Sequence, residues 1–265
     1  MPFLRRPGEV EIHWEEHGQG PLVIFLQHCF ARPAVYQGLC DELAGDHRLV
    51  TYDPRGTGES TRKGPYDLRV DVEDLEALVD ELGGDAVAVG LGDGRDRAAR
   101  LAWSRPDLLL AVVGCDATPI GRYIGDEVEA PSASQAVLEA VVRLARTNHR
   151  AAMRALLEFT NPGMTDDELR RRLDAEVAYS SPEAIASRSQ WFLQKDIAET
   201  ARALCDRLWI AYWESEWAPR GVAARIPQVF PEAHVHAVEA GPISRPELTA
   251  DVVRQAVRTS VGVQR

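Results

Sequence analysis

Ala86-Val-Ala-Val-Gly-Leu-Gly-Asp-Gly-Arg-Asp96 is the stretch of sequence that decides the fold. Its first four residues are small or β-branched and apolar, as expected of a buried strand, and the glycines at positions 90, 92 and 94 predict a sharp turn. Arg97–Ser104 then has the composition of a helix. A strand, a tight turn and a helix form an elbow, whose middle residue carries the nucleophile in many enzymes. Here the middle residue is Gly92, which has no side chain.

Apolar strands and helices alternate along much of the chain. Leu22–Gln27 and Leu108–Gly114 are apolar at nearly every position, which is typical of parallel strands buried on both faces. Strands are expected at Val10–Glu15, Leu22–Gln27, Arg48–Tyr52, Ala86–Leu91, Leu108–Gly114, Arg207–Tyr212 and His234–Val238, and helices at Ala34–Leu43, Asp67–Leu82, Pro219–Ile226 and Pro246–Ser260. The alternation predicts an α/β fold with a parallel sheet covered on both faces.

Residues 118–195 interrupt this alternation, because they carry helical signals only. Helices are expected at Ser132–Ala145 and Arg150–Phe159. Thr165-Asp-Asp-Glu168 has the pattern of a capping box, and Ser181-Pro182 places an N-cap serine before a proline at the first helical position. We therefore predict an α/β core of residues 1–117 and 196–265, with a helical cap of residues 118–195 inserted into it.

The composition excludes several classes of partner. Asp and Glu outnumber Lys and Arg by 41 to 30, so the net charge is −11, which argues against nucleic acid because phosphate contacts need a basic face. No apolar run is long enough to span a membrane, and the first residues lack the apolar segment of a signal peptide. The four cysteines form no C-x-x-C pair that would indicate a zinc site. We expect a cytoplasmic bacterial monomer or homodimer that binds a small molecule and uses no metal or cofactor.

Four landmarks beyond the strand pattern narrow the fold. They are His28-Cys-Phe30, the loop Asp53-Pro-Arg-Gly-Thr-Gly-Glu-Ser60, the elbow with Ser104-Arg-Pro-Asp107 after its helix, and the late loops Trp213–Glu216 and Glu239–Glu247. In order and spacing they resemble the oxyanion loop, the D-x-R-G-x-G-x-S loop, the nucleophile elbow, and the acid and histidine loops of the α/β-hydrolase superfamily. The resemblance covers essentially the whole chain. It implies a mostly parallel, eight-stranded sheet flanked by helices, with the helical cap inserted after the sixth strand.

The chain departs from that resemblance at two catalytic positions. The superfamily places Ser, Asp or Cys where this chain has Gly92, and a histidine where this chain has Gly241-Pro-Ile243. A one-residue slip would bring Asp93 to the nucleophile position, at the cost of the usual spacing. A serine triad needs its nucleophile, base and orienting acid together. Because two of the three are missing, we expect a degenerate triad without ordinary serine esterase chemistry.

Three titratable side chains are the catalytic candidates. Asp93 is either a general base or an anchor for a cationic group, or else the N-cap of the following helix. His28 is either a general acid or base, or a brace of its loop, as the resemblance implies. Glu216 keeps the acid position, where it either orients or protonates a substrate or is an inert loop carboxylate. Arg95 and Asp96 are expected to make surface or helix-cap contacts.

Substrate binding is expected at the elbow and beneath the cap. The resemblance makes the backbone N–H groups of Cys29 and Asp93 the oxyanion donors, with the Cys29 thiol an inert wall of the pocket beside Phe30 and Gly92. Aromatic side chains either line a pocket under the cap or belong to the core; the pocket candidates are Tyr123, Trp191 and Trp213. Such a pocket suits an aromatic or polycyclic molecule.

Three functions are consistent with these residues. The first is a non-hydrolytic enzyme of bacterial secondary metabolism, of lyase, cyclase, isomerase or dehydratase type, that uses Asp93, Glu216 or His28 as acid and base. The second is an ester or epoxide hydrolase that uses Asp93 or a relocated site. The third is a ligand-binding protein that has kept the pocket and lost turnover.

Overall fold

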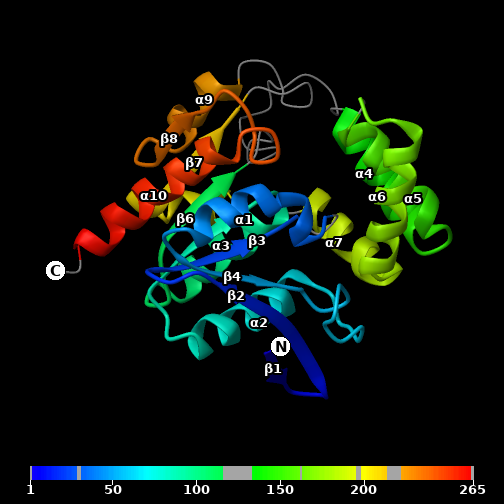
Figure 1. Cartoon of the computed structure of the whole chain (residues 1–265), viewed down its shortest axis with the longest axis horizontal. Helices are drawn as coiled ribbons and strands as arrows, with labels where there is room; N and C mark the ends of the chain where they lie inside the picture. The colour runs from blue at the N-terminus through cyan, green and yellow to red at the C-terminus, as the bar shows by residue number, and fades with distance from the viewer. Residues whose placement is uncertain are drawn as a thin grey trace.

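The computed structural model describes residues 2–28, 31–115, 133–161, 163–194, 198–213 and 222–263. Within these residues eight strands form one sheet in the order β1-β2-β4-β3-β5-β6-β7-β8 (Figure 1). The strands are β1 (Phe3–Arg6), β2 (Val10–His17), β3 (Leu22–Leu26), β4 (Arg48–Tyr52), β5 (Ala86–Gly90), β6 (Leu109–Cys115), β7 (Leu208–Tyr212) and β8 (His234–Ala237). β2 is antiparallel to both of its neighbours, β1 and β4. The six strands β3 to β8 are all parallel to their neighbours among these six. The predicted mostly parallel, eight-stranded sheet is therefore confirmed.

Alternate side chains of each central strand enter opposite faces of the sheet, which explains why these strands are apolar throughout. In β3, Val23 and Phe25 belong to one buried cluster, and Ile24 belongs to the other. The first cluster is covered by α1 (Gln37–Ala44) and α10 (Pro246–Val263), and the second by α2 (Leu68–Glu81), α3 (Asp93–Ser104), α8 (Ala198–Arg202) and α9 (Val222–Val229). These layers fix the carboxyl ends of the parallel strands at one edge, where α/β sheets bind ligands.

Three elements differ from the sequence expectation. The strand pattern does not predict β1, a four-residue edge strand whose side chains are exposed or half-buried. α3 begins at Asp93, four residues before the expected start at Arg97, because Gly92 alone forms the turn and the next residues are already helical. α8 has five residues, which is too short to show a helical period in the sequence.

A bundle of four helices, here called the cap, follows β6 and lies to one side of the sheet in Figure 1. Its helices are α4 (Ala133–Ala145), α5 (His149–Thr160), α6 (Asp166–Tyr179) and α7 (Pro182–Gln194). They pack around their own buried cluster, which includes Met153, Leu157 and Ile185. The predicted capping box is present, since Thr165 and Glu168 each accept a hydrogen bond from the backbone of the other.

Polar contacts tie this bundle to the core. The guanidinium of Arg188 in α7 is fully buried and contacts both carboxylate oxygens of Asp71 in α2, at 2.7 and 2.8 Å. It also donates to the carbonyl oxygen of Arg55 over 2.8 Å. At the end of α6, the hydroxyl of Tyr179 donates to Asp53 over 2.7 Å. The cap therefore meets the core on the loop after β4 and on α2.

His149, the first residue of α5, makes the stability of the cap sensitive to pH. Its Nε2 atom lies 3.3 Å from the Ser180 hydroxyl. Burial lowers the pKa of His149 below its ordinary value of 6.5; nearby Glu183 opposes this shift and Arg62 adds to it. The unfolded state therefore binds a proton more readily than the folded state, so the free energy of unfolding is unaffected well above pH 6.5 and falls as the pH drops below it.

His149→Gln is expected to weaken this loss of stability in acid, because glutamine does not titrate. The measurement is the difference in Tm between about pH 7.5 and about pH 5.5, on either side of the ordinary histidine pKa. His236→Gln is the comparison variant, and it is expected to change the difference in Tm in the same direction. Burial also lowers the pKa of His236, and nearby His234 adds to this shift. A His149→Gln variant with the wild-type difference in Tm would contradict the assignment.

Candidate functional site

Gly92 forms the tip of the elbow between β5 and α3. Its φ of 51° and ψ of −117° lie in a region that glycine adopts at little cost and other residues rarely adopt. The turn is closed by the N–H of Gly94, which donates to the Leu91 carbonyl oxygen over 2.8 Å. Gly94 is also required by close packing, because a Cβ there would overlap the Leu26 carbonyl oxygen. The residue at the tip is Gly92, and Asp93 lies one residue beyond it as the first residue of α3.

The imidazole of His28 lies against Gly92. A Cβ built on Gly92 would overlap the Cδ2 atom of this ring and would lie 2.7 Å from its Nε2 atom. His28 follows the end of β3, and its side chain is 25% exposed. The ring therefore occupies the space that the side chain of a nucleophile at position 92 would enter.

Asp93 faces His28 from the other side of the ring. Its side chain is fully buried, with Oδ1 3.3 Å from the Nδ1 atom of His28 and Oδ2 3.3 Å from the Nη2 atom of Arg97. The N-cap of α3 is Gly92, so of the two alternatives for Asp93 the one in which it caps this helix is wrong. A proton on Nδ1 of His28 fits this carboxylate, and that tautomer makes Nε2 the basic nitrogen of the ring.

Arg97, one turn into α3, supports both partners of this pair. It is fully buried, donates from Nη1 to the Tyr52 hydroxyl oxygen over 2.7 Å, and donates from Nη2 to the Gln27 carbonyl oxygen over 2.9 Å. Burial raises the pKa of Tyr52 to about 12, so Tyr52 stays a neutral phenol. Arg97 thus offsets the charge of Asp93 and holds the backbone next to His28.

Arg95 and Asp96 are buried as well, at 5% and 1% exposure, so the expectation of surface contacts is wrong for both. Arg95 donates from Nη2 to Asp96 Oδ1 over 3.1 Å. Its side chain has room because β6 carries a glycine there: a Cβ on Gly114 would lie 2.8 Å from the Arg95 Cδ atom. The first turns of α3 therefore bury a charged cluster at the edge of the sheet.

Trp213 lies against the loop that contains the other incomplete triad position. It follows β7, and a Cβ built on Gly241 would lie 2.7 Å from its Cε2 atom and 2.8 Å from its Cζ2 atom. The indole therefore packs directly on the loop in which a catalytic histidine was expected. Trp191, the other described aromatic candidate, is half-buried in α7.

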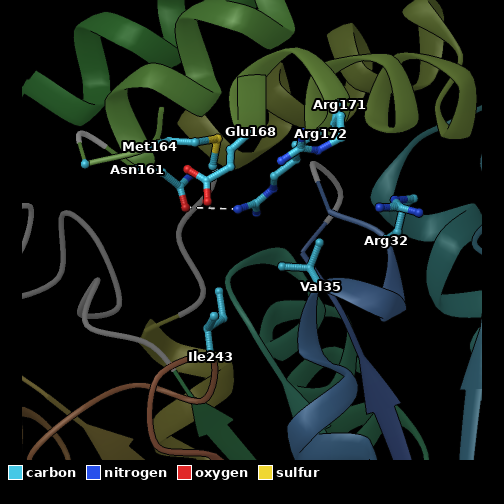
Figure 2. Close-up of a pocket in the computed structure, with 9 residues that line it drawn as sticks. Arg32, Val35, Asn161, Met164, Glu168, Arg171, Arg172 and Ile243 are labelled. Carbon is cyan, nitrogen blue, oxygen red and sulfur yellow. Dashed lines mark hydrogen bonds between the residues drawn. The ribbon is translucent and has the colours of Figure 1, made fainter. Parts of the chain in front are cut away.

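A groove of about 660 Å³ lies between the cap and the core. Figure 2 shows side chains from α6 and the segment that precedes it, from the segment after β3 and from the loop after β8. The described residues that line it are Arg32, Val35, Asn161, Gly163, Met164, Glu168, Arg171, Arg172 and Ile243, with no aromatic side chain among them. Three of these residues are arginines, so a polar ligand fits this groove better than a polycyclic one.

No family model matches this sequence. The chain is 30% identical over 211 residues to the 2-(acetamidomethylene)succinate hydrolase of Mesorhizobium japonicum, and the match covers 77% of this chain and 70% of the relative. The chain belongs to the α/β-hydrolase superfamily. The chain has the same fold as the crystal structure of E-2-(acetamidomethylene)succinate hydrolase, with a TM-score of 0.70, 22% identity, and coverage of 97% of this chain and 100% of that one. The enol-lactonase of Burkholderia xenovorans LB400 also shares the fold, with a TM-score of 0.72, 19% identity, and coverage of 98% and 100%.

Of the predicted site residues, the structure brings three together: His28, Gly92 and Asp93. The remaining predictions Cys29, Phe30, Tyr123 and Glu216 lie outside the described residues. The sequence reasoning missed Arg97 and the groove arginines. A signal for Arg97 exists, because Asp93 and Arg97 are four residues apart and face each other on a helix.

The described part of the chain has neither a metal-binding cluster nor a membrane-spanning helix. Among the described residues, no three side chains of His, Cys, Asp or Glu gather in a way that could hold a metal ion. None of the described helices is both long and apolar enough to cross a membrane.

Gly92→Ser is expected to lower the free energy of unfolding by about 2–4 kcal/mol, because the serine would adopt a strained backbone and displace His28. Denaturant unfolding measures the change. Gly8→Ser is the matched control, since Gly8 also has a positive φ, of 79°, but nothing lies within 4 Å of a Cβ there. Equal losses for the two variants would mean that His28 does not occupy the space in front of Gly92.

Proposed function

We propose that this chain is an enzyme that transfers protons with His28 and forms no covalent intermediate at the elbow. The reaction is of lyase, cyclase, isomerase or dehydratase type, and the substrate is a small molecule. One observation carries the proposal: the His28 imidazole stands where a nucleophile would be, with its Nδ1 atom 3.3 Å from the buried Asp93 carboxylate. A histidine oriented by a carboxylate is a common general base.

In this proposal the Nε2 atom of His28 removes a proton from a carbon next to a carbonyl group. Asp93 then stabilises the imidazolium that forms, and Arg97 balances the carboxylate in the buried interior. The electron pair moves to the carbonyl oxygen, where the amino end of α3 favours negative charge. His28 then returns the proton either to another atom of the substrate or to a leaving group, which departs with its bonding electrons as the electron pair of the enolate forms the new carbon–carbon double bond.

Hydrolysis is the second candidate, and it is favoured by the 30% identical relative, which is a 2-(acetamidomethylene)succinate hydrolase. His28 would then activate a water molecule in place of a serine. Asp93 has less support as a nucleophile, because its side chain is fully buried between His28 and Arg97. An aromatic or polycyclic substrate also has less support, because no described side chain that lines the groove is aromatic. Secondary metabolism, a cytoplasmic location and a monomeric or homodimeric state stay predictions from the sequence.

Deuterium exchange tests the proposal. The protein is incubated in D₂O with levulinate, an enolisable keto acid, and with 1-tetralone, an aromatic ketone, and the loss of C–H signal is followed by proton NMR. The proposal expects exchange faster than in buffer for at least one of them. Cleavage of p-nitrophenyl acetate in H₂¹⁸O with no exchange would favour the hydrolase instead, and neither activity would favour a non-catalytic binding protein.

A further inference from the structure

The groove between the cap and the core carries an excess of positive charge. We propose that it binds the carboxylate group of a small organic acid, and that this acid is the substrate on which His28 acts. The substrate assignment rests on the proposed function, whereas the binding of a carboxylate does not. The core contributes Arg32 to the groove, four residues after His28 in the chain. The cap contributes Arg171 and Arg172 from α6 (Figure 2).

Arg32 and Arg172 both lie near the same buried carboxylate, that of Glu176. The Nε atom of Arg32 lies 3.4 Å from Oε1 of Glu176, and the Nε atom of Arg172 lies 4.0 Å from the same oxygen. The two guanidinium groups are therefore close together, one from the core and one from α6. Two like charges at this separation repel unless anions balance them.

The donors of these arginines exceed the acceptors around them. The Nε atom of Arg172 is buried and has no hydrogen-bond partner among the described residues, although Nη1 donates to Asn161 over 3.0 Å. Within the same described part of the chain, the terminal nitrogens of Arg32 have no hydrogen-bond partner, and the side chain of Arg171 has none either. Only the Nε atom of Arg172 is a buried donor without an acceptor, which is costly. The side chains of Arg32 and Arg171 are partly or fully exposed, so their donors are open to a ligand that brings oxygen atoms.

The carboxylates of the groove do not balance its arginines. Glu168 is engaged by the N–H and hydroxyl groups of Thr165, at 2.9 and 2.6 Å, in the helix cap. Glu176 is fully covered, and burial raises its pKa above the ordinary value against the opposing effect of Arg32 and Arg172. Three arginines face at most these two carboxylates among the described residues, in a protein whose net charge is −11. The groove is therefore a local site for one additional negative charge.

The remainder of the groove suits a short carbon skeleton. Val35, Met164 and Ile243 contribute apolar side chains to its lining, and Figure 2 shows Val35 and Ile243 below the arginines. Arginine matches a carboxylate with two parallel hydrogen bonds. The chemistry of this lining thus selects an organic acid with a small apolar body over an inorganic ion or a neutral ring system.

Isothermal titration calorimetry with succinate tests the inference, with neutral succinamide as the comparison ligand. We expect saturable binding of succinate at millimolar concentration and none of succinamide. Arg172→Gln is expected to weaken binding about tenfold or more, because it removes charge-assisted hydrogen bonds. Arg171→Gln, which removes no hydrogen bond between described residues, is expected to weaken it about two- to threefold at low salt.

Two further variants sharpen the test. Glu176→Gln removes the carboxylate that Arg32 and Arg172 share, so it is expected to strengthen succinate binding. Arg170→Gln is the control on the same helix, because Arg170 is exposed and pairs with Asp167 outside the groove. Circular dichroism verifies that each variant is folded.

Failure of this inference is distinguishable from failure of the proposed function. No saturable binding of succinate, or binding that folded Arg172→Gln and Arg171→Gln both retain undiminished, would overturn it. His28→Asn is expected to keep the affinity for succinate while it loses deuterium exchange. If the wild-type protein binds succinate with the expected dependence on the arginines and catalyses no exchange, the carboxylate site is supported and the proposed proton transfer by His28 is contradicted.

Discussion

His28→Asn is expected to slow the exchange of deuterium into levulinate by about 10²–10⁴-fold, the range that a positioned general base contributes. Asparagine can still donate a hydrogen bond to Asp93, so the loop keeps its buried partner. It cannot accept a proton, because an amide is not basic at neutral pH. The measurement is the initial exchange rate by proton NMR, together with the Tm, which is expected to change little.

Asp93→Asn and His17→Gln are the comparison variants for His28→Asn. In Asp93→Asn the new amide can present its N–H to Nδ1 of His28, which places the imidazole proton on Nε2 and removes the base, and it no longer carries the negative charge that stabilises the imidazolium. A large loss of rate is therefore expected here too. His17 is 58% exposed at the end of β2, and its replacement is expected to leave the exchange rate unchanged. A wild-type exchange rate in His28→Asn would exclude His28 as the base.

Arg188→Leu is expected to lower the free energy of unfolding by about 3–5 kcal/mol, because it leaves the buried carboxylate of Asp71 without its partner. Asp71 and Arg188 are both buried, and their two hydrogen bonds measure 2.7 and 2.8 Å. The same substitution removes the donor to the Arg55 carbonyl oxygen. In a chain of this size the loss corresponds to a decrease in Tm of roughly 10 °C.

Two controls separate the buried charge from the loss of the side chain. The double variant Asp71→Leu with Arg188→Leu is expected to recover at least half of the stability, since no unpaired charge is then buried. Arg154→Leu breaks an exposed pair with Glu158 on α5 and is expected to cost less than about 0.5 kcal/mol. If Arg188→Leu were as mild as Arg154→Leu, the ion pair would not hold the cap to the core.

The sheet and the helices of the cap could be predicted from the sequence. Continuous apolar runs such as Leu22–Leu26 identify strands buried on both faces, because parallel strands between two helical layers have no polar side. The start of α6 was predictable because the capping box of Thr165 and Glu168 uses only residues three positions apart. β1 could not be predicted in this way, because a four-residue edge strand is too short to show a clear alternation of apolar and polar residues.

The site was only partly predictable. The glycine pattern located the elbow, and Gly92 adopts the positive φ that such a turn requires. The sequence did not indicate that the His28 ring fills the space in front of Gly92, or that Arg95 and Asp96 are buried. Charged residues in a helix are exposed more often than buried. The local composition therefore favoured exposed side chains for Arg95 and Asp96, whereas both are buried.

By itself the sequence determined the elbow, the absence of a side chain at Gly92 and the order of strands and helices, because turn geometry and apolar periodicity depend on neighbouring residues. Only the tertiary structure decided what stands in front of Gly92 and what lines the groove. His28 reaches Gly92 across 64 residues of chain, and Arg32 reaches Glu176 across 144. Contacts of this kind are set by how β3, β5 and α6 pack together, and no pattern within one segment encodes them.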